Sequence, residues 1–147
     1  MIISAILHCN LHLERVGDQA VNVAKMYLRT KDARGSVSMR QQIEEMGSLV
    51  VAMVRTAMES FGRRDLDLAF KVPMMDDPVD RLNRSTHLEA LKLADDATQL
   101  DWGLHMNMAA RALERVGDNA VDIGEQVGFV ETGLFREFSD ASRAREV

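Results

Sequence analysis

The sequence predicts an all-α fold, and three observations support this. Apolar residues recur at alternating steps of four and three in two long segments, residues 2–29 and 101–132, which is the spacing of one helix face. No segment alternates apolar and polar residues for long enough to indicate a strand. The 147 residues include only two prolines and nine glycines, so long loops are not expected.

The first two helices are predicted at residues 2–29 and 38–62, separated by the polar segment KDARGS. The apolar seam of the first helix consists of Ile2, Ile6, Cys9, Leu13, Val16, Ala20, Val23 and Tyr27. One face of the second helix carries Ile43, Met46, Val50, Met53 and Ala57. We interpret these methionines as core residues rather than metal ligands, because the flexible thioether readily fills gaps in a core.

A third helical segment is predicted over residues 65–97, interrupted by Pro73 and Pro78. Asp77 followed by Pro78 is typical of an N-cap and a first helical residue. Leu82, Leu88, Leu91 and Leu93 then provide apolar positions.

The last helix is predicted at residues 101–132, ending at Gly133. Its seam consists of Trp102, Met106, Ala109, Leu113, Val116, Ala120, Ile123, Val127 and Val130. Residues 136–147 are predicted to form a loose polar tail.

Composition excludes several classes of protein. A net charge of −5 and a pI near 5.3 argue against nucleic acid as the main partner. The single cysteine, Cys9, allows neither an internal disulfide nor a thiolate zinc site, so we expect it to be a core residue of a cytoplasmic protein. No apolar run reaches the roughly 18 residues of a membrane span. The start, MIISAILHCN, does not resemble a signal peptide.

A nine-residue motif occurs twice, as LERVGDQAV near the start and LERVGDNAV near the end. Residues 13–24 and 113–124 are identical at eight of twelve positions, at an offset of one hundred. The apolar seams of the two helices coincide at this offset. This correspondence indicates duplication of a helical unit.

The motif also places acids on each helix away from the seam. At about 100° per residue, Glu114, Asp118, Asp122 and Glu125 share one side, which we expect at the outer surface of the bundle. Like charges one turn apart destabilise a helix by a few tenths of a kcal/mol. The default interpretation is a solvated face, but the repulsion between the acids can also be offset by an arginine or by a bound cation.

Two further features favour a site. Gly17 and Gly117 lie in the middle of both helices, where glycine costs about 1 kcal/mol relative to alanine. We expect a backbone or a side chain from elsewhere to approach them closely. Carboxylates one turn apart can bind hard cations such as iron, manganese, magnesium or calcium, and zinc is compatible too.

Other candidate sites are weaker. His8 and His12, or Asp101 and His105, have ligand spacing but no evident third ligand. The sequence contains no Glu-x-x-His pair, no phosphate-binding glycine loop and no nucleophile with a general base. An enzyme is therefore not expected.

The paired LERVGD motif resembles the PhoU family of phosphate-transport regulatory proteins, as do FVETG at residues 129–133 and VPMMDDPVDRL at residues 72–82. The resemblance implies two similar three-helix bundles, each ending in a motif helix. Residues 35–135 would form a complete antiparallel bundle. Residues 1–34 would be the last helix of an incomplete first bundle, packed onto the complete bundle or exchanged with a second chain in a homodimer, and residues 136–147 a polar tail.

The resemblance also implies multinuclear metal clusters, with iron expected first and zinc, manganese or magnesium as alternatives. The matching positions are Glu14 and Asp18 in the first motif and Glu114, Asp118 and Asp122 in the second. Asp76 and Asp80 have the same spacing, although a helix starting at Pro78 would place Asp76 off the helical face. Lys25 stands where the second motif has Glu125, so the second site is the stronger prediction.

The function implied is negative regulation of phosphate uptake and phosphate-starvation signalling in the cytoplasm. Such a protein would link the phosphate-specific ABC transporter to a sensor histidine kinase, with peripheral membrane association left open. The alternatives are a metal-free helical adaptor, whose acids contact basic groups of a partner, and a metal-dependent phosphohydrolase.

Overall fold

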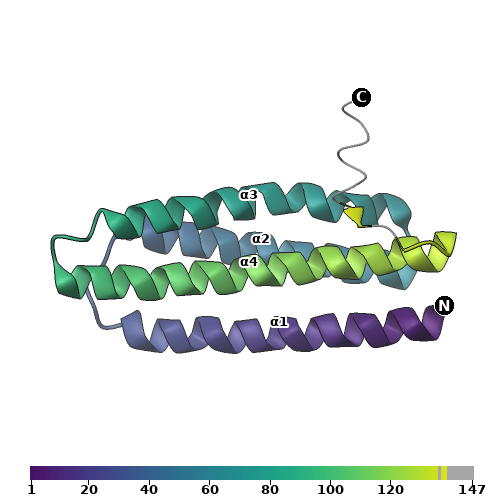
Figure 1. The fold of residues 1–147 in the computed structure, drawn as a ribbon, viewed down its shortest axis with the longest axis horizontal. Helices are drawn as coiled ribbons and strands as arrows, with labels where there is room; N and C mark the ends of the chain where they lie inside the picture. Colours follow the sequence, from purple (N-terminus) through teal and green to yellow (C-terminus); the bar gives the residue numbers. More distant parts are fainter. Residues whose placement is uncertain (136, 139–147) are drawn as a thin grey trace, which may run out of the picture.

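The computed structural model describes residues 1–135 and 137–138, which form four α-helices and no strand (Figure 1). The helices are α1 (Ile2–Thr30), α2 (Val37–Arg63), α3 (Leu66–Leu91) and α4 (Ala97–Thr132). The predicted all-α class is confirmed. None of the described helices is both long and apolar enough to cross a membrane.

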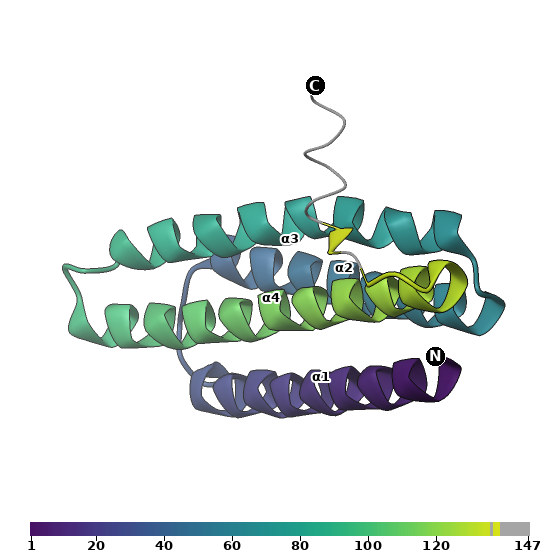
Figure 2. The same cartoon turned by 45° about the vertical axis from the view of Figure 1, so that its right-hand side comes forward.

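Helix α4 is the centre of the structure, because α1, α2 and α3 all pack against it. Helices α2, α3 and α4 form an antiparallel three-helix bundle, and α1 lies along the outside of α4 (Figures 1 and 2). This arrangement confirms the predicted bundle with one additional N-terminal helix.

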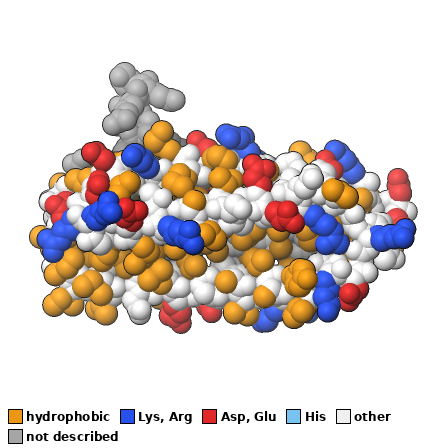
Figure 3. Space-filling view, turned by 180° about the vertical axis from the view of Figure 1, so that it is seen from behind, with side chains coloured by type: hydrophobic (Ala, Val, Ile, Leu, Met, Phe, Trp, Pro, Cys, Tyr) orange, Lys and Arg blue, Asp and Glu red, His pale blue; other side chains and the backbone are white. Residues whose placement is uncertain are grey.

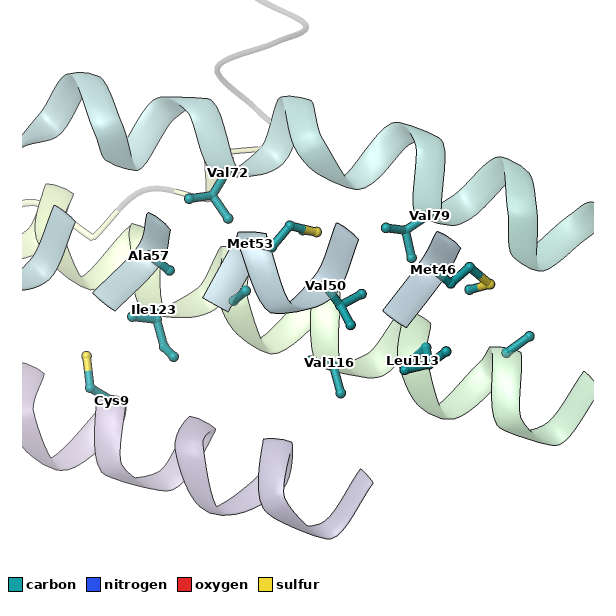
Figure 4. Packing of buried hydrophobic residues seen from close by; sticks show 12 residues of the cluster. Cys9, Met46, Val50, Met53, Ala57, Val72, Val79, Leu113, Val116 and Ile123 are labelled. Carbon is teal, nitrogen blue, oxygen red and sulfur yellow. The ribbon is translucent and has the colours of Figure 1, made fainter. Parts of the chain in front are cut away.

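The main core lies between α2, α3 and α4, with a contribution from α1 (Figure 4). The predicted face of α2 is correct, since Met46, Val50, Met53 and Ala57 are buried. The predicted seam of α4 is also correct, and all of it is buried except the half-buried Val130. Cys9 joins this core, and burial raises the pKa of its thiol to about 11. The interpretation of Cys9 as a core residue is therefore confirmed.

The predicted interruption of the third helix is wrong. Helix α3 runs unbroken through Pro73 and Pro78, and its N-cap is Asp65, which accepts a hydrogen bond from the Leu68 amide. A proline removes one helical hydrogen bond. In α3, the Ala69 carbonyl that lacks the Pro73 donor lies close to α4, where a Cβ on Gly124 would be 3.4 Å from its oxygen. Packing of the whole helix therefore outweighs the local effect of the prolines.

The predicted seam of the first helix is only partly correct. Cys9 is buried and Val16 and Val23 are half-buried, but the other predicted positions are exposed. The buried face consists instead of Ala5, Cys9, His12, Met26 and Thr30. The apolar face predicted from periodicity is wider than the face that α4 covers, so part of it stays open to solvent.

The end of α4 follows the prediction, because Gly133 has φ 72° and its amide bonds to the Phe129 carbonyl. The tail predicted at residues 136–147 lies outside the described residues, apart from 137–138. Within these two, Phe138 is buried against Ala69 and Val127, so the prediction of a loose tail is wrong at this residue.

Candidate metal centre

Four carboxylates gather in the groove between α3 and α4. Asp76 and Asp80 lie one turn apart on α3, and Glu114 and Asp118 lie one turn apart on α4. Burial raises the pKa of Asp76 to about 7, assisted by repulsion from the other three carboxylates and from Asp77. Burial also raises the pKa of Asp118, and Glu114 and Asp80 add to this effect. The groove therefore concentrates negative charge that the protein only partly compensates.

Gly117 creates the space that brings the two helices' acids together. A Cβ at this position would lie 2.6 Å from Oδ1 of Asp76, closer than nonbonded atoms approach. That oxygen is buried and has no hydrogen-bond partner among the described residues. The expectation that a side chain reaches across Gly117 is confirmed. Gly17, its repeat equivalent, has no atom within 4 Å of such a Cβ, so the same expectation fails there.

The continuity of α3 corrects the position expected for Asp76. A helix beginning at Pro78 would have left Asp76 off the helical face, but both residues lie within α3. Asp76 is half-buried, and its buried Oδ1 atom would be stabilised by either a proton or a cation.

The chemistry of this donor set suits a hard cation. All four groups offer carboxylate oxygens, the ligands preferred by magnesium, manganese and iron. Arg111 is the nearest compensating cation, and its Nη1 donates to Glu114 Oε2 at 2.6 Å. No three acidic, histidine or cysteine side chains within the described residues already converge as a ligand set. Cation binding would therefore require the carboxylates to change rotamer.

Asp122, predicted to share a site with Glu114 and Asp118, adds to the repulsion that raises the pKa of Asp118 and also contacts α1. Its Oδ2 lies 3.3 Å from Nδ1 of His12 on α1, and the same nitrogen lies 3.0 Å from Oδ1 of Asn119. The buried His12 thus holds α1 against α4. The pairing of His12 with His8 as ligands is not seen, since His12 instead contacts α4.

The predicted outward stripe of acids is therefore divided by the tertiary structure. Glu114 and Asp118 face α3, and Asp122 faces α1. Glu125 is buried and accepts a hydrogen bond of 2.8 Å from the Phe138 amide. Burial raises the pKa of Glu125. These acids differ in environment because α4 has a neighbour on three sides, and Asp118 remains exposed at the edge of the groove.

The first-motif acids have a different environment. Glu14 and Asp18 are exposed on α1 and form no ion pair within the described part of the chain. Lys25, which stands where the second motif has Glu125, is exposed as well and takes part in none of these ion pairs. The exposed Asp101 contacts the half-buried His105 at 3.5 Å within α4.

Asp76 with Asp80, and Glu114 with Asp118, were predicted from the sequence as separate pairs. The structure joins the two pairs across the groove. The only sequence signal for this junction was Gly117, whose unfavourable place in a helix indicated a close approach. The role of His12 at the α1–α4 contact was not predicted, because one buried histidine leaves no pattern in the sequence.

A four-helix architecture with a repeated acidic motif and a carboxylate-lined groove defines an all-helical protein with a candidate metal centre. The chain belongs to the PhoU family, since the family model described as PhoU domain matches residues 43–127.

The relatives support this assignment. The chain is 30% identical over 132 residues to phosphate-specific transport system accessory protein PhoU homolog 1 of Thermotoga maritima, covering 89% of this chain and 57% of that protein. It is 32% identical over 137 residues to the corresponding homolog of Pseudomonas aeruginosa, covering 92% and 57%. The crystal structure of PhoU from Pseudomonas aeruginosa superimposes with a TM-score of 0.83 at 32% identity, over 90% of this chain and 64% of that one. The chain therefore spans little more than half the length of these curated relatives.

Proposed function

We propose that this chain is a non-catalytic accessory protein of phosphate transport. It acts as a metal-binding helical adaptor in the cytoplasm, linking the phosphate-specific ABC transporter to a sensor histidine kinase. In this role it lowers phosphate uptake and phosphate-starvation signalling. Family membership supports the link to phosphate transport, because the relatives are named as accessory proteins of the phosphate-specific transport system.

The observation that carries the metal-binding part is the unpaired, buried oxygen of Asp76 among three other carboxylates. Asp76, Asp80, Glu114 and Asp118 would hold the cation, and iron is expected first, with zinc, manganese and magnesium as alternatives. When bound, the metal would neutralise the groove and fix α3 against α4. The surface presented to a partner by these two helices would then depend on metal loading.

Metal analysis of two matched variants tests this part. One variant carries Glu114→Gln and Asp118→Asn, and its control carries Glu14→Gln and Asp18→Asn, the same changes in the repeat. We expect the first pair to abolish most of the bound metal and the control pair to retain it. Loss of metal only in the control would move the centre to α1. Negligible metal in the wild-type protein would favour the metal-free adaptor.

The partner assignment needs its own test. Purified cytoplasmic domains of the transporter and of the kinase are passed over the immobilised chain, with and without chelator. We expect retention of both, reduced by the chelator and by the Glu114→Gln and Asp118→Asn variant. Failure of both domains to bind the metal-loaded chain would contradict the adaptor role.

We also propose that the open face of α1 packs against a second copy of this chain. Residues in the repeat have equivalent positions on α1 and α4 but different environments: Leu13 is 36% exposed, whereas Leu113 is 7% exposed. The open face includes Ile3, Leu7, Val21 and Leu28, and hydrophobic side chains gather over α1 in the lower half of Figure 3. Next to it lies an apolar groove of about 420 Å³ between α1 and α2, lined by valines of both helices.

Exposed hydrophobic residues gathered on one helix are typical of an interaction surface. In a two-fold arrangement, each α1 would enter the groove between α1 and α2 of its partner. Light scattering after size exclusion should give twice the 16.5 kDa chain mass. Ala20→Glu, which puts a charge into the groove, should yield a monomer, and Met74→Glu on exposed α3 should not. A strictly monomeric wild-type chain would refute the dimer.

A further inference from the structure

The groove between α3 and α4 changes character one turn beyond the acidic cluster. Toward the loop at residues 92–96 it widens into a cleft of about 560 Å³. Its polar lining consists of Asn83, Arg84 and His87 on α3 and Asn107 and Arg111 on α4. The described residues that line it include no carboxylate. An acidic segment and a basic segment thus follow each other along one groove.

The basic segment has the donors that an oxyanion requires. A guanidinium carries five N–H donors in a planar fork that matches a phosphate or a carboxylate. Arg111 uses one donor on Glu114, and Arg84 forms no ion pair within the described residues. The Asn107 amide lies 3.5 Å from Nδ1 of His87, so the two helices are in polar contact at the cleft.

The size of the cleft and its apolar lining indicate a ligand larger than an inorganic anion. A volume of about 560 Å³ lies within the range of small-molecule sites, which is roughly 300–1,000 Å³. Leu88 and Met108, both more than half exposed, flank the polar groups. A ligand with a charged head and an apolar body would bury these two side chains.

We propose that this cleft binds a phosphomonoester, with Arg84 and Arg111 holding the phosphoryl group and Leu88 and Met108 contacting its apolar substituent. The ligand is either a small phosphate ester or a phosphorylated side chain of a peptide, which share this chemistry. The acidic cluster one turn away opposes the binding of an anion. A cation bound in that cluster would therefore strengthen the binding of the phosphomonoester. This coupling rests on the proposed metal centre.

Calorimetric titration of the full chain tests the site. The titrants are phenyl phosphate, orthophosphate and a short phosphotyrosine peptide, all in chelator at constant ionic strength. Because the titrations are metal-free, their outcome is separate from that of the metal analysis. We expect saturable binding of phenyl phosphate, at least several-fold tighter than that of orthophosphate, because burial of an apolar group adds affinity.

Two arginine variants on α3 provide the matched comparison. Arg84→Gln removes a charge from the cleft and should weaken phenyl phosphate binding about ten- to hundredfold, as expected for a lost charge-assisted hydrogen bond. Arg81→Gln removes an exposed charge of the same helix that does not line the cleft, and should leave binding within about twofold. Far-ultraviolet circular dichroism confirms that both variants are helical.

Some of the remaining outcomes identify the source of the ligand, and others overturn the proposal. Tighter binding of the phosphotyrosine peptide than of phenyl phosphate supports a partner chain, and equal binding supports a small ester. Absence of saturable binding overturns the site. An equal loss in Arg84→Gln and Arg81→Gln overturns it too, since that result reflects net charge alone. Equal affinity for orthophosphate and phenyl phosphate overturns the role of Leu88 and Met108.

Discussion

Alanine at the two repeated glycines should change stability in opposite directions. Gly17 and Gly117 occupy equivalent positions in the same motif, one on α1 and one on α4. The space around Gly17 is empty to 4 Å from an added Cβ. An added Cβ at Gly117 would meet Asp76 Oδ1 at 2.6 Å and Met53 Cε at 3.4 Å. The comparison therefore isolates the approach of Asp76 from the helix propensity of the residue.

The magnitudes follow from two opposing effects. Replacing a mid-helix glycine by alanine favours the folded helix by about 1 kcal/mol. At position 117, overpacking costs about 1–3 kcal/mol, because the buried Oδ1 atom of the short Asp76 side chain would have to move away from α4. We expect Gly17→Ala to stabilise the protein by about 0.5–1 kcal/mol. Gly117→Ala should destabilise it by up to about 2 kcal/mol.

Urea unfolding in chelator at pH 7, followed by circular dichroism, measures both changes. With a typical urea dependence of about 1–3 kcal/mol per molar, the largest expected difference of about 3 kcal/mol should separate the midpoints by roughly 1–3 M. A further variant, Gly117→Ala with Asp76→Ala, should recover the stability lost in the single variant. If both single variants raised the midpoint equally, Asp76 would not occupy the space above Gly117.

Three other measurements follow from buried groups. The folded pKa of Asp76 is raised from 3.8 to about 7, so its contribution to stability is lost as pH rises through this interval. Asp76→Asn should therefore stabilise the metal-free protein at pH 8 by about 2 kcal/mol and have little effect at pH 4. This figure is about half the free energy that corresponds to the full pKa shift, because the side chain is partly solvated. Glu125→Ala should cost about 1–2 kcal/mol in thermal unfolding by removing the acceptor of the Phe138 amide, and an unchanged Tm would contradict this. Cys9, with its pKa raised to about 11, should react with a disulfide reagent at pH 8 only after unfolding in urea, so immediate labelling of the native chain would show that it is accessible.

The groove combines opposite charges in a way that bears on regulation. Arg111 belongs to both segments, because it donates to Glu114 and also lines the basic cleft. A cation coordinated by Glu114 would free the Arg111 N–H group that bonds to Glu114, and this group could then donate to an anion. The two proposed sites would then be coupled through one side chain. Reciprocal enhancement of the two affinities is the expected signature.

Much of the fold could be predicted from the sequence because the deciding interactions are local. The seam of α4 and the face of α2 follow from apolar residues repeating with the helical period. Gly133 ends α4 because glycine readily adopts positive φ. In two places the local pattern was not sufficient to predict the structure. Helix α3 continues through its prolines, and the seam of α1 is wider than its buried face, because each depends on contacts made by a whole helix.

The candidate site was predictable only in part for the same reason. The repeated motif by itself determined which residues are acidic, their spacing of one turn and their separation from the apolar seam. Only the tertiary structure decided that Asp76 and Asp80 of α3 lie beside Glu114 and Asp118, that His12 of α1 contacts Asp122, and that Asp76 reaches α4 above Gly117. A helical period specifies which residues share a face, but not which neighbour packs against that face. The two copies of one motif therefore have different environments, with Glu114 and Asp122 half-buried on α4 and Glu14 and Asp18 exposed to solvent on α1.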